Sequence, residues 1–330
     1  MRKLIKSFKE LDKKSVNIAG GKGASLGEMT RVGISVPQGF VVLAPAFDRF
    51  LRESPYPKNS EADLGVAVRA ELDKINYKDI NSVDRASNAI RGLIHNAPML
   101  DDLRKEILAD FKKLKSKYVA VRSSATAEDS SAASWAGELE SYLDTTEKQL
   151  LENIKRCWSS LFTPRAIFYR NEKKLLKTKV SVAVVVQTMV ESEISGICFT
   201  VHPVTKDKNQ MIIEAGWGLG EAIVSGSITP DSYVVDKRDN SIIDINISKQ
   251  EKMIVRKAGP SAGSGGTGGV KTVSVPKSKQ EKQVLTGKRI VELAKICAAI
   301  EKHYKKPQDI EWAFAKGRFY IVQSRPITTL

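Results

Sequence analysis

Gln308-Asp-Ile-Glu-Trp-Ala-Phe-Ala-Lys-Gly-Arg-Phe-Tyr-Ile-Val-Gln-Ser-Arg-Pro326 consists of two alternating segments around a Lys-Gly pair, a pattern that predicts a β-hairpin. Alternation places Asp309 and Glu311 on one face of the first strand. These acids share their face with Gln323 and Arg325 only if opposed residue numbers sum to an even value, which requires an odd-length loop around the glycine. Such a cluster suits a divalent metal and a polyphosphate, although an ordinary polar face is the alternative.

The composition excludes few classes of function. A chain of 330 residues that is 42% hydrophobic can bury a large core, as one domain or two lobes. The net charge of +15 invites a nucleic-acid partner, but the 53 Lys and Arg residues are spread along the chain and only 7% of residues are aromatic. Small anionic ligands fit the charge equally well, as does a solvated lysine-rich surface. No nucleic-acid partner is therefore expected.

The cysteines and the hydropathy pattern indicate the compartment. Cys157, Cys198 and Cys297 are odd in number, far apart and embedded in apolar runs, which is typical of reduced core thiols and a cytoplasmic protein. Residues 1–14 lack an apolar signal segment, and the longest apolar run, residues 182–186, is too short to span a bilayer. We expect neither secretion nor a membrane partner.

The order of patterns predicts an α+β protein of two lobes, residues 1–178 and 179–330. In the first lobe we expect a glycine turn and helix at 17–29, a strand at 36–42, helices over 46–117, a short strand at 118–121 and two helices within 147–176. In the second lobe we expect strands at 180–189, 196–201, 210–214 and 232–235, a disordered Gly/Ser loop at 259–269 and a helix at 289–303 before the hairpin.

Two glycine-rich segments were tested against known phosphate motifs. Gly20-Gly-Lys22-Gly fails as a Walker A loop, because Val16 stands where its first glycine belongs and Gly23 where Ser or Thr should follow the lysine. What remains is a lysine on a glycine turn at a helix start, which favours an anion; a solvated lysine is the alternative. The segment 216–221 lacks the Rossmann spacing, so no dinucleotide is assigned to it.

Two further segments suit a nucleotide. Arg122 ends the strand at 118–121 and precedes a Ser/Ala-rich run, residues 123–134, which we expect to be a mobile loop that closes over phosphates gripped by the arginine. A structural arginine beside a linker is the alternative. Residues 184–190 form a buried strand whose end turns polar, where a purine fits, although a plain core strand has the same pattern.

These segments together resemble the N-terminal nucleotide-binding domain of the phosphoenolpyruvate synthase and pyruvate phosphate dikinase family, which rifampin phosphotransferases share. The resemblance spans essentially all 330 residues in the same order. It implies an ATP-grasp fold with the nucleotide between two lobes. The matching segments are Gly20-Gly-Lys-Gly-Ala-Ser-Leu-Gly-Glu, Val36-Pro-Gln-Gly-Phe, Val121-Arg-Ser-Ser-Ala-Thr-Ala-Glu-Asp, Trp135-Ala-Gly-Glu, Gly196-Ile-Cys-Phe-Thr, Gly218-Leu-Gly-Glu and the hairpin residues 309–326.

The resemblance also implies residue roles. Mg²⁺ would be bound by Glu311 and Gln323, with Asp309 assisting, and Arg325 would stabilise the phosphoryl group in flight. ATP would be bound by the remaining predicted residues: Lys22 and Arg122 at the phosphates, Gly137 and Ser141 near the nucleotide, and Gln187 and the backbone of Met189 at the adenine. Lys22, Arg122 and Arg325 are the implied catalytic residues. Positioning and charge neutralisation are what phosphoryl transfer mainly requires.

The implied reaction transfers the β-phosphoryl of ATP to a histidine through a pyrophosphoryl intermediate, releasing AMP and phosphate; synthase-like members then phosphorylate pyruvate. None of His95, His202 and His303 stands in the family's Thr-Ser-His-Ala context or in a metal-ligand spacing. We therefore expect the phosphohistidine and pyruvate-binding domains on a separate chain or lost from a longer one. A domain with another acceptor, a rifampin-phosphotransferase-like enzyme and a non-catalytic ATP sensor are the alternatives. Alone, the chain should bind Mg-ATP, hydrolyse it slowly at most, and not make phosphoenolpyruvate.

Overall fold

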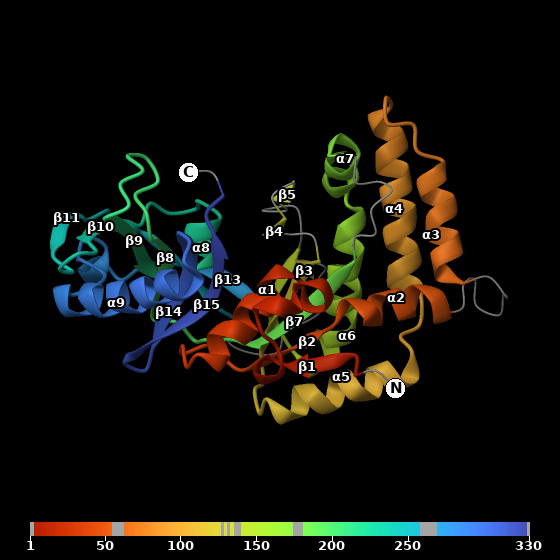
Figure 1. Ribbon diagram of the computed structural model, residues 1–330, viewed down its shortest axis with the longest axis horizontal. Helices are drawn as coiled ribbons and strands as arrows, with labels where there is room; N and C mark the ends of the chain where they lie inside the picture. The colour runs from red at the N-terminus through yellow and green to blue at the C-terminus, as the bar shows by residue number, and fades with distance from the viewer. Residues whose placement is uncertain are drawn as a thin grey trace. The chain divides into compact units, whose positions relative to one another are not determined.

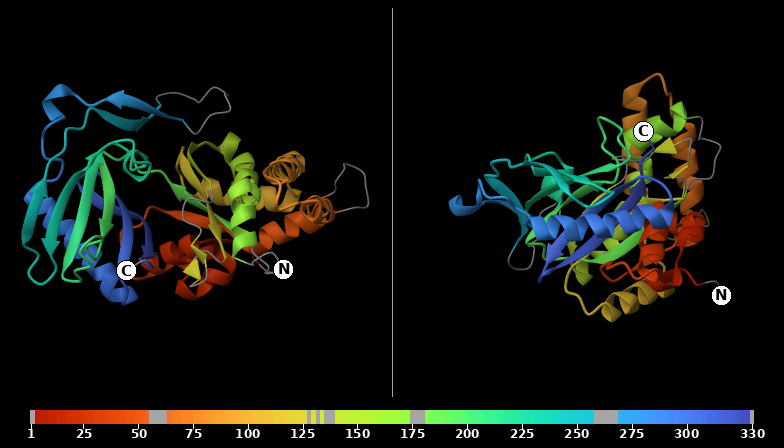
Figure 2. Two further views of the ribbon diagram at one scale, coloured as in Figure 1. Left: turned by 90° about the horizontal axis from the view of Figure 1, so that it is seen from above. Right: turned by 60° about the vertical axis from the view of Figure 1, so that its left-hand side comes forward.

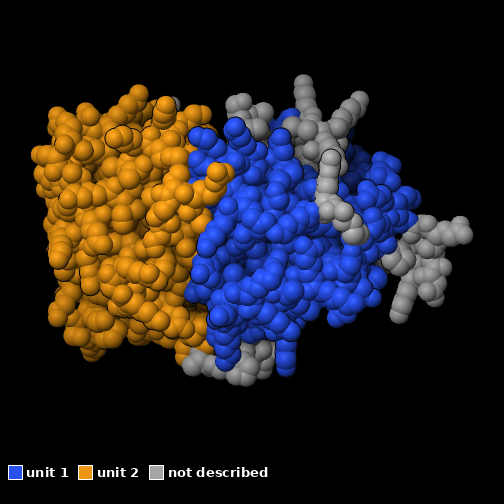
Figure 3. Space-filling model, turned by 60° about the horizontal axis from the view of Figure 1, so that its bottom comes forward, with its two compact units in different colours: residues 1–28, 38–189 blue, residues 29–37, 190–330 orange. Residues whose placement is uncertain are grey.

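The computed structural model describes residues 3–54, 63–126, 129–130, 133–134, 140–173, 181–257 and 269–328. Helices and antiparallel sheets are both present, so the predicted α+β class is confirmed. The chain forms two compact units, residues 1–28 with 38–189 and residues 29–37 with 190–330 (Figure 3). No helix within the described ranges is long and apolar enough to cross a membrane.

Unit 1 contains a five-stranded antiparallel sheet in the order β1-β2-β7-β3-β6. Its strands are β1 (Ile5–Ser7), β2 (Gly39–Val42), β3 (Val119–Ala125), β6 (Ser141–Thr145) and β7 (Val182–Thr188). The expected boundary near residue 178 assigns β7 to the second lobe, whereas β7 forms the middle of this first sheet. The reason is that β7 is an apolar strand buried almost throughout, and it pairs on both edges, with β2 and β3.

Most helices of unit 1 cover one face of this sheet (Figure 1). Trp158, fully buried, stacks on Phe47 and contacts Phe50, joining α6 to α2 in a core that includes Val121 and Val184 of the sheet. Aromatic side chains of this size contribute much of the buried apolar area. The helices are α1 (Val16–Arg31, whose last residues belong to unit 2), α2 (Ala44–Glu53), α3 (Leu64–Asp73), α4 (Ile80–Asn96), α5 (Asp101–Lys113), α6 (Glu147–Ser159) and α7 (Pro164–Glu172).

The strand that contains Arg122 is longer than predicted. β3 continues to Ala125, so Arg122 lies in the middle of a paired strand and not at its end, and the expected mobile loop cannot begin at Ser123. Ser123 Oγ and Ser124 Oγ donate hydrogen bonds to the carbonyls of other segments, which is how small polar residues are accommodated inside a sheet. Two short strands follow, β4 (Asp129–Ser130) and β5 (Ala133–Ser134); residues 127–128 and 131–132 of the predicted loop lie outside the described residues.

Unit 2 contains a six-stranded antiparallel sheet in the order β11-β10-β9-β8-β14-β15, and α9 (Gly287–Tyr304) lies along one face of it (Figure 2). The buried residues of α9 are the predicted stripe of Ile290, Leu293, Ala294, Cys297 and Ile300. The strands are β8 (Ile194–Phe199), β9 (Gln210–Trp217), β10 (Asp231–Asp236), β11 (Ile242–Asn246), β14 (Gln308–Ala315) and β15 (Arg318–Pro326).

A separate two-stranded hairpin, β12 (Lys252–Arg256) with β13 (Val270–Ser274), and the short helix α8 (Glu221–Val224) complete unit 2. The hairpin contacts the end of β9 through an isolated bridge between Gly218 and Ile254. The predicted Gly/Ser-rich loop at 259–269 falls, apart from its last residue, outside the described residues.

The closing hairpin has the predicted strands but a different loop. Lys316 and Gly317 both have positive φ angles, 51° and 78°, and form a two-residue turn, which is the type I′ geometry of tight hairpins. The odd-length loop that the shared face was expected to require is therefore not what joins the two strands. A β-bulge in β15 corrects the register instead. Glu311 opposes Gln323 and the next residue of β14, Trp312, opposes Ile321, so Val322 is an extra residue of β15.

Candidate functional site

Three of the sequence-predicted residues share one face of the first sheet. Arg122 of β3 is opposed by Ser141 of β6 on one side and by Val185 of β7 on the other, and Gln187 follows two positions along β7. Directly opposed residues of antiparallel strands project from the same face. We call this surface, with Arg122, Ser124, Ser141 and Gln187, the Arg122 face. The other face belongs to the apolar core.

Helix α1 places Lys22 beside the Arg122 face. The helix is kinked at Gly20, where φ is 68° and ψ is 173°. Gly20 and Gly23 approach the sheet closely: a Cβ on Gly20 would lie 2.2 Å from Ser124 Oγ, and one on Gly23 would lie 3.1 Å from Val41 Cγ2. Only glycine permits this backbone approach, and it brings the half-buried Lys22 to the same side of the sheet as Arg122.

The predicted adenine residues include a buried side chain without a complete set of partners. Gln187 is only 3% exposed, and its Nε2 has no hydrogen-bond partner among the described residues. An unpartnered buried amide is costly, so a ligand acceptor at this point would relieve it. The Met189 amide already donates to the Tyr118 carbonyl at 3.1 Å. If Met189 meets an adenine through its backbone, it does so through its carbonyl oxygen.

The second sheet gathers the predicted metal and phosphate residues on one face. Asp309 is opposed by Arg325, and Glu311 by Gln323, as the hairpin prediction required. Arg325 donates from Nε and Nη2 to Asp309 Oδ2 at 2.9 and 2.7 Å, and Gln323 Nε2 donates to Glu311 Oε1 at 2.9 Å. The bulge at Val322 makes this pairing possible despite the two-residue turn.

Glu214 is a further acid that the sequence analysis did not select. It lies on β9 opposite Ile197 of β8, which in turn opposes Glu311 of β14. Glu214 therefore shares a face with Asp309 and Glu311, and we call this surface, with Gln323 and Arg325, the acidic face. No hydrogen bond or ion pair joins the Glu214 side chain to another residue that the structure describes. A lone acid in the apolar run 211–215 was the available signal.

Burial makes the acidic face electrostatically unfavourable as it stands. Burial raises the pKa of Asp309, while the neighbouring Arg325 opposes this rise and Glu311 adds to it. Burial also raises the pKa of Glu214, with a smaller contribution from the negative charge of Asp309. Each carboxylate thus favours its neutral form more than usual, and a bound cation would favour the charged form and oppose the effect of burial.

The residues fit Mg²⁺ only together with a ligand. Across the described ranges, no group of three or more His, Cys, Asp and Glu side chains is arranged to hold a metal ion. Mg²⁺ is commonly bound through one or two carboxylates, substrate phosphates and water. Glu311 and Gln323 supply a carboxylate and an amide oxygen side by side, which is compatible with that mode.

The three cysteines and the three histidines have structural surroundings. Cys157, Cys198 and Cys297 are buried free thiols, as predicted. Burial lowers the pKa of His95, whose Nε2 lies 2.8 Å from Ser159 Oγ. His202 Nδ1 accepts backbone amides of the turn that follows it, and His303 packs edge-on against Tyr304. Gly137 lies outside the described residues.

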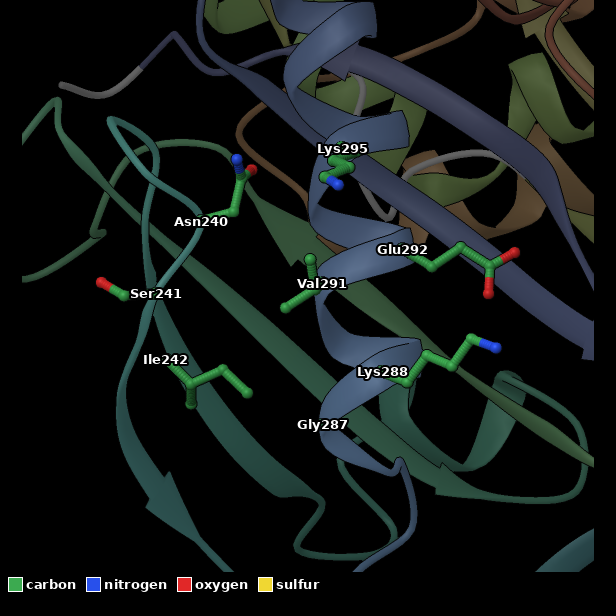
Figure 4. A pocket seen from close by; sticks show the side chains of 8 residues that line it. All are labelled: Asn240, Ser241, Ile242, Gly287, Lys288, Val291, Glu292 and Lys295. Carbon is green, nitrogen blue, oxygen red and sulfur yellow. The ribbon is translucent and has the colours of Figure 1, made fainter.

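A surface groove of about 650 Å³ lies on the opposite side of the second sheet from the acidic face. Its walls are the turn before β11 and the first half of α9, and Val291 points toward the β11 side while Lys288 and Glu292 extend away from it (Figure 4). None of the predicted site residues lines this groove. It is therefore separate from the candidate site.

Comparison with known families identifies the family of the chain. The model of the pyruvate phosphate dikinase AMP/ATP-binding domain matches residues 16–330. The chain belongs to this family. It is thus an ATP-binding domain of the dikinase type, and the α+β architecture agrees with an ATP-grasp fold.

The similar curated proteins are longer enzymes. The chain is 45% identical to the "Probable phosphoenolpyruvate synthase" of Methanocaldococcus jannaschii, over 99% of the chain and 27% of the relative. It is 43% identical to the phosphoenolpyruvate synthase of Pyrococcus furiosus, over 99% of the chain and 44% of the relative. Identity to the rifampicin phosphotransferase of Bacillus subtilis is 36%, over 100% of the chain and 36% of the relative. The chain spans less than half the length of each.

Proposed function

We propose that this domain binds Mg-ATP and transfers its β-phosphoryl group to a histidine of another domain, as the nucleotide part of a phosphoenolpyruvate-synthase-type enzyme. The observation that carries the proposal is the register of the closing hairpin, which opposes Glu311 to Gln323 and Asp309 to Arg325 in a chain of the dikinase family. The higher identity to the synthases than to the rifampicin enzyme supports the synthase type.

In this proposal the residues of the Arg122 face and Lys22, all in unit 1, bind the nucleotide. Lys22 and Arg122 bind the phosphate oxygens, and Ser141 lies near the nucleotide because it opposes Arg122. Gln187 donates its unpartnered Nε2 to the base. Two fixed cations at a polyphosphate orient it and neutralise its charge, which is the main protein contribution to phosphoryl transfer.

On the acidic face, Glu311 and Gln323 hold Mg²⁺, and Asp309 with the unpartnered Glu214 adds negative charge around it. Mg²⁺ neutralises phosphate oxygens and favours displacement at phosphorus. Asp309 holds the Arg325 guanidinium at 2.7 Å, and the nearly half-exposed Arg325 side chain is suited to stabilise the group in transfer. Water is consumed overall: ATP, water and a histidine give AMP, phosphate and phosphohistidine.

Product analysis tests the proposal. Purified chain with Mg-ATP should give AMP only when a histidine-domain protein is supplied, and the label of β-³²P-ATP should appear on that protein. The control omits Mg²⁺. ADP as the only product, or an unlabelled partner in the presence of demonstrated Mg-ATP binding, would reject the transfer and leave a nucleotide-sensing role.

A further inference from the structure

A buried serine hydroxyl joins the glycine turn of α1 to strand β3. Ser124 Oγ donates to the Ala19 carbonyl at 2.9 Å and accepts from the Gly23 amide at 3.3 Å. In a regular α-helix the amide of residue 23 donates directly to the carbonyl of residue 19. Gly20 opens the helix here, and the hydroxyl of Ser124 bridges the two groups. Insertion of a side chain into the hydrogen-bond ladder is a known cause of helix kinks.

The bridge leaves little freedom to the glycine turn. Ser124 has no exposed surface, and a Cβ on Gly20 would lie 2.4 Å from the Ser124 carbonyl oxygen, so the two backbones are in direct contact. Water has no access to replace the hydroxyl in this contact. Loss of the hydroxyl would remove both of these buried hydrogen bonds at the point where the helix is kinked.

The bridge also lies between the two predicted phosphate-binding cations. Lys22 is within the bridged segment 19–23, and Arg122 stands two positions before Ser124 on the same face of β3. We propose that Ser124 is a positioning residue, which fixes the Lys22 turn relative to the Arg122 strand so that both cations meet one polyphosphate. The inference rests on the proposed function, because it assigns these cations to ATP.

Ser124→Ala is the direct test, with Ser123→Ala as its matched control. Ser123 is an equally buried serine of the same strand, but its hydroxyl projects from the other face and donates to the Glu140 carbonyl at 2.8 Å. Binding of Mg-ATP and of adenosine to the full chain is measured by displacement of a fluorescent nucleotide. Ser124→Ala should weaken Mg-ATP about tenfold and leave adenosine unchanged, because only the phosphate end is mispositioned. Ser123→Ala should lower the melting temperature without changing the Mg-ATP to adenosine ratio.

Two further measurements separate positioning from a loss of stability. In a Lys22→Ala background, Ser124→Ala should have little further effect on Mg-ATP binding, since the residue acts through Lys22. Hydrogen exchange of the Gly23 amide should become faster in Ser124→Ala and stay slow in Ser123→Ala, which tests the bridge without any nucleotide.

The outcomes are distinguishable. Equal weakening of Mg-ATP and adenosine by Ser124→Ala, additive effects with Lys22→Ala, or unchanged Gly23 exchange would each overturn the positioning role while the proposed function stands. Absence of Mg-ATP binding by the unsubstituted chain would overturn the proposed function, and the role of Ser124 with it.

Discussion

The Arg122 face of the first sheet and the acidic face of the second sheet hold their charges in different ways. Apart from Arg122, the predicted residues of the first face are uncharged, and a hydroxyl bridge ties its backbone to the helix that carries Lys22. The acidic face carries three acids and one arginine, and two of these acids, Glu214 and Asp309, have raised pKa values. The first face is joined to its helix by neutral hydrogen bonds, whereas the second holds two acids whose charged forms are disfavoured by burial.

This difference indicates how the two faces depend on ligand. Burying a carboxylate without a counter-charge costs free energy, whereas buried hydroxyls with complete hydrogen bonds do not. Substitutions on the acidic face should therefore trade stability against nucleotide binding. Substitutions on the Arg122 face should mainly lower binding.

The largest expected effect is on the acidic face. Glu311→Ala should weaken Mg-ATP binding about 100-fold, because it removes the proposed carboxylate ligand of Mg²⁺ and leaves Gln323 without its acceptor. Calorimetric titration with and without Mg²⁺ measures it. Glu301→Gln is the control, since it removes an acid of α9 that pairs with Lys237 at 2.8 Å. Equal weakening in the absence of Mg²⁺ would show that Glu311 does not act through the metal.

Substitution of Arg122 should have the second-largest effect on Mg-ATP binding. Arg122→Ala should weaken Mg-ATP binding about tenfold or more, and Arg122→Lys should recover only part of this, because an ammonium does not reproduce the two-point geometry of a guanidinium. The same titration measures both. Arg165→Ala removes an exposed arginine of α7 and should have no effect. Full recovery by lysine would mean that this face supplies charge alone, and the proposed contrast between the faces would fail.

Glu214→Gln should lower binding and raise stability. The pKa of Glu214 is raised in the folded state. Its side chain therefore contributes favourably to stability below the pKa of the unfolded state, and this contribution is lost as the pH rises through the pKa of the folded state. At pH 7 the amide should raise the melting temperature by a few degrees and weaken Mg-ATP binding by less than Glu311→Ala does.

Asp236→Asn on the neighbouring strand β10 is the control with the opposite sign. Hydrogen bonds from Arg238 lower the pKa of Asp236 to about 2. The Asp236 side chain therefore contributes favourably to stability above the pKa of the unfolded state, and this contribution is lost as the pH falls through the pKa of the folded state. The substitution should lower the melting temperature at pH 7. A lower melting temperature for Glu214→Gln would contradict the view that the acidic face is unfavourable without a cation.

The smallest expected effect concerns Gln187. Gln187→Met should bind Mg-ATP a few-fold more weakly, because one hydrogen bond to the base is lost, and it should be slightly more stable, because a buried unpartnered amide is removed. Gln308→Met is the matched control, because Gln308 is 1% exposed and both the nitrogen and the oxygen of its side-chain amide are hydrogen-bonded. The Gln308→Met variant should be less stable than the unsubstituted chain. Thermal melts with and without nucleotide measure both. Loss of stability in Gln187→Met would place the residue in the core alone.

Local patterns were sufficient for some elements and not for others. The stripe on α9 follows from periodicity and is confirmed. The opposition of Asp309 to Arg325 was expected only with an odd-length loop, and the bulge at Val322 produces it with a two-residue turn. The division of the chain into two units does not follow from local patterns, because nothing within an apolar run such as β7 indicates which sheet the strand joins. Glu214 was missed for a related reason: its place on the acidic face depends on pairing through β8, residues 194–199, which alternation within one strand cannot reveal.

The bulge in the closing hairpin has a consequence for variation in chain length. Val322 is the one residue between Ile321 and Gln323 that no residue of β14 opposes. Deleting it would leave every opposed pair in place. Deleting a residue between it and the turn, such as Tyr320, would leave Arg325 opposite Asp309 but would move the buried Ile321 from opposite Trp312 to opposite Ala313, and so to the other face of the sheet. Among descendants of this sequence, insertions and deletions in the hairpin should therefore be tolerated at Val322 and selected against on either side of it.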